Sequence, residues 1–165
     1  MSQVATSTEV EPIQIEKAQI VSGHGWGAFQ LLGAGRKGRA SIQQDRLRVI
    51  EDWNNGTLFL LCDGHSQGGE DAAQLIIDEL PTLLDKHHFS THRFFATERA
   101  CHDMDRLIKS RTLGGSTLAL VHITQNDLFV ANVGDARVSS LEEDSLNQHT
   151  RDHRADFIPL REELE

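Results

Sequence analysis

The order of apolar patterns along the chain constrains its fold more than any other feature. Residues 46–50 alternate charged and apolar side chains, which is typical of a half-buried strand. Residues 57–62 form a continuous apolar run, and residues 54–56 between the two stretches read Asn-Asn-Gly. Because Asn and Gly tolerate the positive φ of a tight turn, we predict a β-hairpin here.

The next pattern predicts a helix, because apolar side chains recur every 3.6 residues over residues 72–80. Gly68 and Gly69 precede this pattern. Pro81 follows it, and proline lacks the N–H that would continue the helical hydrogen bonds. We therefore expect Pro81 to end or kink this first helix.

A second helix is predicted from an apolar stripe that begins at Phe94. Ser90 or Thr91 is its expected N-cap, since short hydroxyl side chains accept from the free N–H groups of a first turn. We assign Phe94, Phe95 and Met104 to the hydrophobic core rather than to a cofactor site.

Strand patterns return after the second helix. Residues 118–123 and 128–133 are apolar and flank a Gln-Asn-Asp turn, and residues 136–140 form a third candidate strand. The tail from Leu141 is polar and poorly patterned. Strands, two helices and strands again predict an α+β fold in which the helices pack on an antiparallel sheet.

Charge and composition exclude several classes of function. The chain has 16 Lys+Arg against 25 Asp+Glu and a formal net charge of −9, which disfavours binding to nucleic acids or to anionic membranes. The longest apolar run is far shorter than a membrane span, and the N-terminus lacks the pattern of a secretory signal. We therefore expect an intracellular protein, either cytoplasmic or nuclear.

The domain organisation is expected to be simple. Residues 1–18 are polar and predict a flexible N-terminal arm, and residues 19–165 are the size of one domain. Cys62 and Cys101 lie far apart without a C-x-x-C pattern, which disfavours a disulfide scaffold or a structural zinc site.

Polar motifs at the ends of the predicted strands are the candidates for chemistry. Asp45 precedes one strand, and Asp63-Gly64-His65 follows the apolar run of another. A carboxylate held at a strand end suits a hard cation such as Mg²⁺ or Mn²⁺. The adjacent glycine lets a backbone carbonyl approach the ion, and a histidine can serve as a general acid. Taken alone, however, an Asp-Gly pair after a strand is usually a turn.

Five motifs in order carry a family resemblance that one motif alone would not. The chain from about Trp26 onward resembles the metal-dependent protein phosphatase family, the protein phosphatase 2C type, in its N-terminal portion. The motifs are Gln44-Asp45, Asp63-Gly64-His65, Gly115-Ser116-Thr117, Asn132-Val133-Gly134-Asp135-Ala136-Arg137 and Thr150-Arg151-Asp152-His153.

This resemblance implies a fold and a reaction. The fold would be a partial β-sandwich of antiparallel sheets with flanking helices, lacking its C-terminal part. The reaction would be hydrolysis of phosphoserine and phosphothreonine in a phosphoprotein substrate. Members of the family use two Mg²⁺ or Mn²⁺ ions, with a third possible. A water or hydroxide that bridges the two ions attacks phosphorus in line, and no phospho-enzyme forms.

The resemblance also implies roles for individual residues. Asp63 would bridge both metal ions, and Gly64 would offer its carbonyl oxygen. His65 would protonate the leaving alkoxide. Asp45 would support the metal cluster, and Asp135 matches a residue associated with an additional metal ion.

The sequence departs from the family pattern at several positions. Gln44 stands where many members have Glu, and Ser66 replaces the glycine that usually follows the histidine. The phosphate-binding arginine is expected five residues before Asp45, and Arg39 lies one residue from that position. The family's later segment supplies two more metal-binding aspartates and further strands, whereas this chain stops at Glu165.

These departures lead to two expectations and leave alternatives open. We expect weak metal binding, and association through exposed sheet edges. The main alternative is a catalytically inactive relative that acts as a binding or regulatory module. A more distant alternative is an unrelated α+β binding module that matches the motifs by coincidence.

Overall fold

The computed structural model describes residues 18–23, 26–31, 42–142 and 145–153. The chain divides into two compact units, Met1–Ser41 and Ile42–Glu165. In the first unit, β1 (Ala18–Gly23) pairs antiparallel with β2 (Trp26–Leu31). The predicted N-terminal arm lies outside the described residues except for Ala18.

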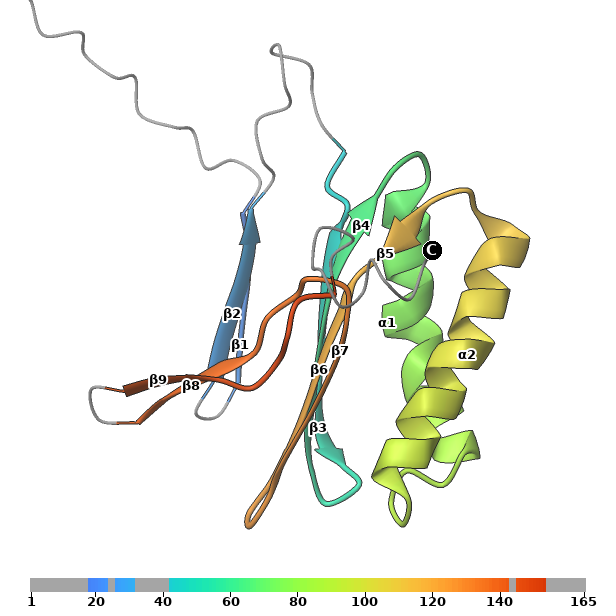
Figure 1. Ribbon diagram of the computed structural model, residues 1–165. Helices are drawn as coiled ribbons and strands as arrows, with labels where there is room; N and C mark the ends of the chain where they lie inside the picture. The colour runs from blue at the N-terminus through green and yellow to red at the C-terminus, as the bar shows by residue number, and fades with distance from the viewer. Residues whose placement is uncertain (1–17, 24–25, 32–41, 143–144, 154–165) are drawn as a thin grey trace, which may run out of the picture. The chain divides into compact units, whose positions relative to one another are not determined.

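The second unit is built on one antiparallel sheet with the strand order β3-β4-β6-β7, and the short β5 pairs with the end of β4. Two helices, α1 and α2, lie on one face of this sheet (Figure 1). Its elements are β3 (Asp45–Trp53), β4 (Gly56–His65), α1 (Gly69–Lys86), α2 (Arg93–Arg111), β5 (Gly115–Ser116), β6 (Leu118–Thr124) and β7 (Leu128–Val133). The predicted α+β class is confirmed.

The β3–β4 hairpin forms as predicted, but β4 is longer than expected. Asn54 and Asn55 both adopt positive φ, at 47° and 63°, as the tight turn requires. The strand then continues through the Asp-Gly-His motif, because Gly64 pairs with Ser116 and His65 with Gly115 of β5. The motif is therefore the end of a strand rather than a turn after one.

The prediction that Pro81 ends or kinks α1 is wrong in its first form, since the helix continues to Lys86. A proline inside a helix leaves the carbonyl four residues earlier without its N–H partner. That carbonyl belongs to Ile77, and the Arg48 guanidinium on β3 donates to it at 2.7 Å. A side chain from the sheet thus satisfies the oxygen that the proline leaves free.

The start of α2 differs from the prediction. His92 is the N-cap, no side chain caps the helix, and Thr91 donates instead to the carbonyl of His88. The core assignment of Phe94 and Phe95 is wrong, because their side chains are 72% and 64% exposed. Both lie in the first turn ahead of the buried stripe, which comprises Ala96, Thr97, Ala100 and Met104. The assignment of Met104 is confirmed.

The remaining strands extend the predicted pattern. A hairpin of β8 (Ser139–Glu142) and β9 (Ser145–Gln148) follows β7. The candidate strand at 136–140 therefore starts three residues later than expected, and the polar tail contains a strand.

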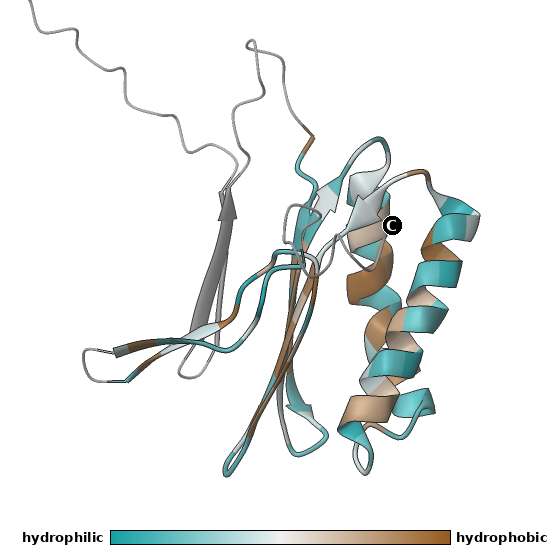
Figure 2. Cartoon of the chain, in the orientation of Figure 1, coloured by the Kyte–Doolittle hydropathy of each residue, from teal (hydrophilic) through white to brown (hydrophobic). Residues whose placement is uncertain are grey.

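The hydrophobic core lies between the helices and the sheet, where apolar residues of both layers meet (Figure 2). Alternate strand residues point to the other face, where the described part of the chain leaves Leu61, Ile123 and Leu128 between 44% and 46% exposed. The resemblance predicts a second sheet for this face. No described helix is long and apolar enough to span a membrane.

Candidate functional site

Asp45 and Asp63, which are 18 residues apart in sequence, are direct cross-strand partners in the β3–β4 register. The two residues line one cavity of about 350 Å³ together with Thr117 and Asp135. The fold therefore places three of the predicted metal-binding residues around one cavity.

The electrostatics of this cavity are those of crowded carboxylates. Burial raises the pKa of Asp63, and the charge and hydrogen bonding of Asp45 and the charge of Asp135 raise it further. His65 acts weakly in the opposite direction. Like-charged oxygen donors at one point of a fold suit a hard divalent cation, so the chemistry of this donor set fits Mg²⁺ or Mn²⁺.

The donor set is nevertheless incomplete. Within the part of the chain that the structure describes, no group of three or more His, Cys, Asp or Glu side chains converges on one ion position. Mg²⁺ commonly binds through one or two carboxylates and keeps several waters, so the Asp45–Asp63 pair is compatible with such an ion. Weak metal binding stays a prediction.

Gly64 is required by the close packing around the site. A Cβ at this position would lie 2.2 Å from the carbonyl oxygen of Gly69 and 2.8 Å from that of Gln44. The amide of Gly64 donates to the same Gln44 oxygen at 3.3 Å. The first residues of α1 therefore pack directly on the Asp-Gly-His strand end.

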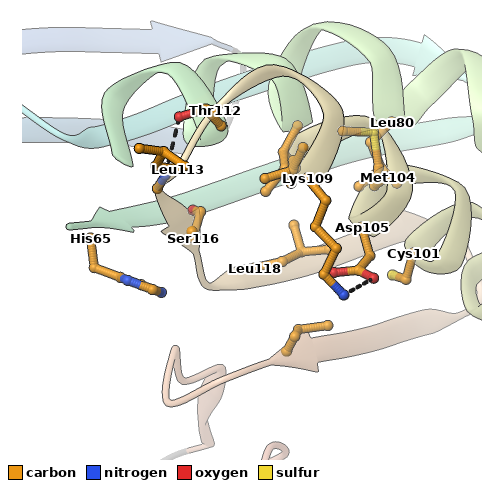
Figure 3. A pocket seen from close by; sticks show the side chains of 15 residues that line it. His65, Leu80, Cys101, Met104, Asp105, Lys109, Thr112, Leu113, Ser116 and Leu118 are labelled. Atoms are coloured by element: carbon orange, nitrogen blue, oxygen red, sulfur yellow. Dashed lines mark hydrogen bonds and ion pairs between the residues drawn. The ribbon is translucent and has the colours of Figure 1, made fainter. Parts of the chain in front are cut away.

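His65 lies two residues beyond Asp63 on the same strand, and its side chain is exposed. Its ring covers Gly115, where a Cβ would lie 2.6 Å from Cε1, and its Nδ1 is 3.3 Å from Ser66 Oγ. The ring stands at one end of a second cavity of about 570 Å³ (Figure 3). Apolar side chains of both helices and of β6 and β7 line part of this cavity: Ile76, Leu80, Met104, Ile108, Leu118 and Val133.

Asp135 lies in the turn that follows β7, where Gly134 has a φ of +83°. The amide of His153 and the side chain of Asn132 both donate to the Gly134 carbonyl, at 2.8 and 3.3 Å. Two residues on, the Arg137 guanidinium donates to both carboxylate oxygens of Asp152. The fourth and fifth sequence motifs are thus packed together, although they are separated by the β8–β9 hairpin.

Two positions that the sequence analysis singled out, Arg39 and Gln44, are not among the residues that line the acidic cavity in the described part of the chain. Arg39 lies outside the described residues, so its proposed contact with phosphate stays a prediction. The Gln44 side chain has a structural role, because its Nε2 donates hydrogen bonds to the Ser66 carbonyl at 2.8 Å and to the Glu70 carboxylate at 2.9 Å. The amide joins the start of β3 to the start of α1.

Sequence reasoning missed Thr117 and Glu70 as parts of this region. Thr117 belongs to the Gly115-Ser116-Thr117 motif, but its contacts depend on the β4–β5 pairing, which no local sequence pattern predicts. Repeated glycines were the available signal for the contact of α1 with the site. A Cβ on Gly114 would lie 2.3 Å from the backbone of Gly68, so these segments meet at the closest approach that two backbones allow.

Comparisons with known proteins place the chain among the protein phosphatases. The family model of protein phosphatase 2C matches residues 41–158. Protein phosphatase 1L of Bos taurus is 30% identical over 120 residues, which are 61% of this chain and 32% of that protein. Probable protein phosphatase 2C 59 of Oryza sativa subsp. japonica is 31% identical over 148 residues, which are 84% of this chain and 45% of that protein.

Solved structures share the fold at lower identity. The catalytic domain of serine threonine protein phosphatase PstP in complex with 2 manganese ions superposes with a TM-score of 0.51 at 23% identity, covering 88% of this chain and 58% of that chain. This chain spans about a third and just under half of the lengths of the two curated relatives. The match to the family model nevertheless covers more than half of the chain, and the chain belongs to the protein phosphatase 2C family.

Proposed function

We propose that this chain carries the N-terminal part of a metal-dependent protein serine/threonine phosphatase, with Asp45 and Asp63 as the carboxylates of its main metal site and Asp135 as a ligand of an additional metal ion. The observation that carries the proposal is the cross-strand pairing of Asp45 with Asp63 in a cavity that Asp135 also lines. Carboxylates that raise one another's proton affinity bind a divalent cation in place of protons.

Bound Mg²⁺ or Mn²⁺ would supply an activated water and stabilise the entering and leaving oxygens of the phosphoryl group. Asp45 and Asp63 would hold the cation through their carboxylates, with Gly64 offering its carbonyl oxygen. The two manganese ions named for the PstP structure support this choice of cation.

His65 would donate the proton to the departing serine or threonine oxygen of a phosphoprotein. Two features support this role. The imidazole is exposed to an incoming substrate, and it follows Asp63 by two residues on a strand held by β5. A histidine is the side chain best suited to proton transfer near neutral pH. Arg39 is the proposed phosphate contact.

Manganese binding by the purified chain tests the proposal most directly. We expect isothermal titration calorimetry to detect weak Mn²⁺ binding that Asp63→Asn abolishes. The matched control is Asp52→Asn, because Asp52 is exposed at the opposite end of β3. Mn²⁺-dependent hydrolysis of a phosphothreonine peptide should likewise be lost in Asp63→Asn and kept in Asp52→Asn. Equal Mn²⁺ affinity in the chain and in Asp63→Asn would refute the metal assignment.

A second function has one observation in its favour, namely the incomplete donor set among the described residues. It is the catalytically inactive relative that binds a partner. Detectable Mn²⁺ binding without any peptide hydrolysis, at enzyme concentrations that reveal turnover by an intact relative, would favour this reading over catalysis.

A further inference from the structure

Thr117 hydrogen-bonds to both the N–H and the C=O group of Asp63. The amide of Asp63 donates to Thr117 Oγ1 at 3.1 Å, and the amide of Thr117 donates to the Asp63 carbonyl at 2.9 Å. Thr117 is the single residue between β5, which pairs with the end of β4, and β6, which lies inside the main sheet. Asp63 is therefore held by the β5–β6 junction as well as by β3.

The methyl group of the same side chain contacts the loop that carries Asp135. A Cβ built on Gly134 would lie 2.9 Å from Thr117 Cγ2, so the methyl group rests against the Gly134 backbone. Gly134 is also held through its carbonyl, which accepts from the amide of His153. Thr117 and Asp135 line the same cavity as Asp45 and Asp63.

We propose that Thr117 is the positioning residue of the acidic site, with its hydroxyl holding Asp63 and its methyl group holding the Gly134-Asp135 turn. One branch of the β-carbon thus serves each of two carboxylates, of which one lies on strand β4 and the other in the turn after β7. Side chains that orient metal ligands without touching the metal commonly alter affinity by 10- to 100-fold when removed. The functional part of this inference rests on the proposed metal site.

Two conservative substitutions separate the branches. Thr117→Val keeps the shape and the methyl contact but removes the acceptor for the Asp63 amide. Thr117→Ser keeps the hydroxyl and removes the methyl contact with Gly134. Thr124→Val is the control, because Thr124 also carries an Oγ1 that bonds backbone but lies at the far end of β6.

Amide hydrogen exchange, followed by NMR without metal, reads the geometry alone. We expect exchange of the Asp63 amide to accelerate at least about tenfold in Thr117→Val and to stay unchanged in Thr117→Ser and Thr124→Val. Amides in the middle of β6 should keep their protection in all three variants. An unchanged exchange rate of the Asp63 amide in Thr117→Val would refute the proposal that Thr117 holds Asp63, independently of metal binding.

Mn²⁺ titration then reads the consequence for binding. We expect the affinity to fall about tenfold in Thr117→Val, to fall less in Thr117→Ser and to be unchanged in Thr124→Val. If the unaltered chain binds Mn²⁺ and Thr117→Val binds it equally well, the positioning role is refuted while the proposed function stands. If the unaltered chain binds no Mn²⁺, the proposed function fails, and so does the role of Thr117 in supporting the metal site. Hydrogen exchange then still tests whether Thr117 holds the Asp63 backbone.

Discussion

Asp63 faces Asp45 across the hairpin, and the resulting repulsion makes the site a local weak point of the metal-free protein. Its pKa is raised by burial and by the neighbouring carboxylates. A raised pKa in the folded state contributes stability that is fully present below the ordinary pKa of aspartate and is lost as the pH rises through the folded-state pKa. At neutral pH the ionised Asp63 therefore opposes folding.

We expect Asp63→Asn to increase the free energy of unfolding of the metal-free chain at pH 7 by about 1 kcal/mol, after allowing for solvent screening of a partly exposed group. The gain should shrink as the pH is lowered and the carboxyl of Asp63 takes up its proton. Urea denaturation with EDTA at pH 7 and pH 4 measures both effects. A loss of stability at pH 7, with Asp52→Asn unchanged, would contradict the repulsion argument.

Ser66 follows the Asp-Gly-His motif with a φ of 66°, a region that costs an ordinary L-residue about 1 kcal/mol. Glycine enters this region freely, so Ser66→Gly should stabilise the chain by a few tenths to about 1 kcal/mol. Ser66→Ala is the matched control, because alanine keeps the backbone strain and, like glycine, lacks the hydroxyl that contacts His65 Nδ1. Thermal unfolding of the three proteins should place Ser66→Gly highest, and equal midpoints for glycine and alanine would exclude strain at this position.

Single residues of the site were predictable where a strand pattern stood beside them. Asp63 follows an apolar run, and the Asn-Asn-Gly turn predicts the hairpin. The exact pairing of Asp45 with Asp63 also depends on a register shift between Ile50 and Trp53, which no sequence pattern indicates. The partners of Gln44 were not predictable in this way. Its amide meets Glu70, 26 residues later, only because α1 returns to pack on the hairpin.

At the scale of elements, Pro81 and Arg48 illustrate why helix boundaries escape local rules. The proline removes the N–H partner of the Ile77 carbonyl, and a local reading ends the helix there. The helix continues because Arg48, 29 residues earlier on β3, donates to that carbonyl. The contact exists only after the sheet and the helix have packed.

A double-mutant cycle measures this compensation. Arg48→Met keeps much of the aliphatic volume and should cost about 1–2 kcal/mol, since the Ile77 carbonyl loses its donor. Pro81→Ala restores the helical N–H and should reduce the cost of Arg48→Met. Urea denaturation of the four proteins gives the coupling energy. Equal costs of Arg48→Met in both backgrounds would show that the guanidinium acts elsewhere.

The sequence also failed to predict which apolar residues near the start of α2 face the core. The apolar pattern located α2 correctly, yet it assigned Phe94 and Phe95 to the core. The helix begins only at Arg93, and its buried face starts at Ala96, which leaves both aromatic rings on the outside. Phe89, just before the helix, takes the buried aromatic position against Trp53 and His122. Tertiary packing therefore chose among apolar residues that sequence alone ranks equally.

At the scale of the whole molecule, the core and the acidic site share strand β4. Leu58, Leu60 and Cys62 point into the core, and the last three residues of the strand carry the site. Cys62 is fully buried, and burial raises the pKa of its thiol from 9.0 to about 12, against a smaller opposing hydrogen bond with Ser116. The folded molecule must therefore keep this thiol protonated.

This requirement predicts how the whole fold responds to alkali. A raised thiol pKa contributes stability that is present below pH 9 and is lost as the pH rises from 9 towards 12, because only the unfolded state ionises freely there. We expect the free energy of unfolding to fall over this range, as urea denaturation under reducing conditions would show. The chain contains no tyrosine, so phenol ionisation cannot produce the same slope.

Substitution of each cysteine assigns the slope. Cys62→Ala should start at lower stability, because it leaves a small cavity, but should lose less stability between pH 9 and 11. Cys101→Ala should keep most of the slope, since Cys101 is only partly buried, although burial raises the pKa of its thiol as well. If Cys62→Ala declines as steeply as the unaltered chain, ionisation of this thiol does not control alkaline unfolding, and the loss must come from groups outside the β4 core.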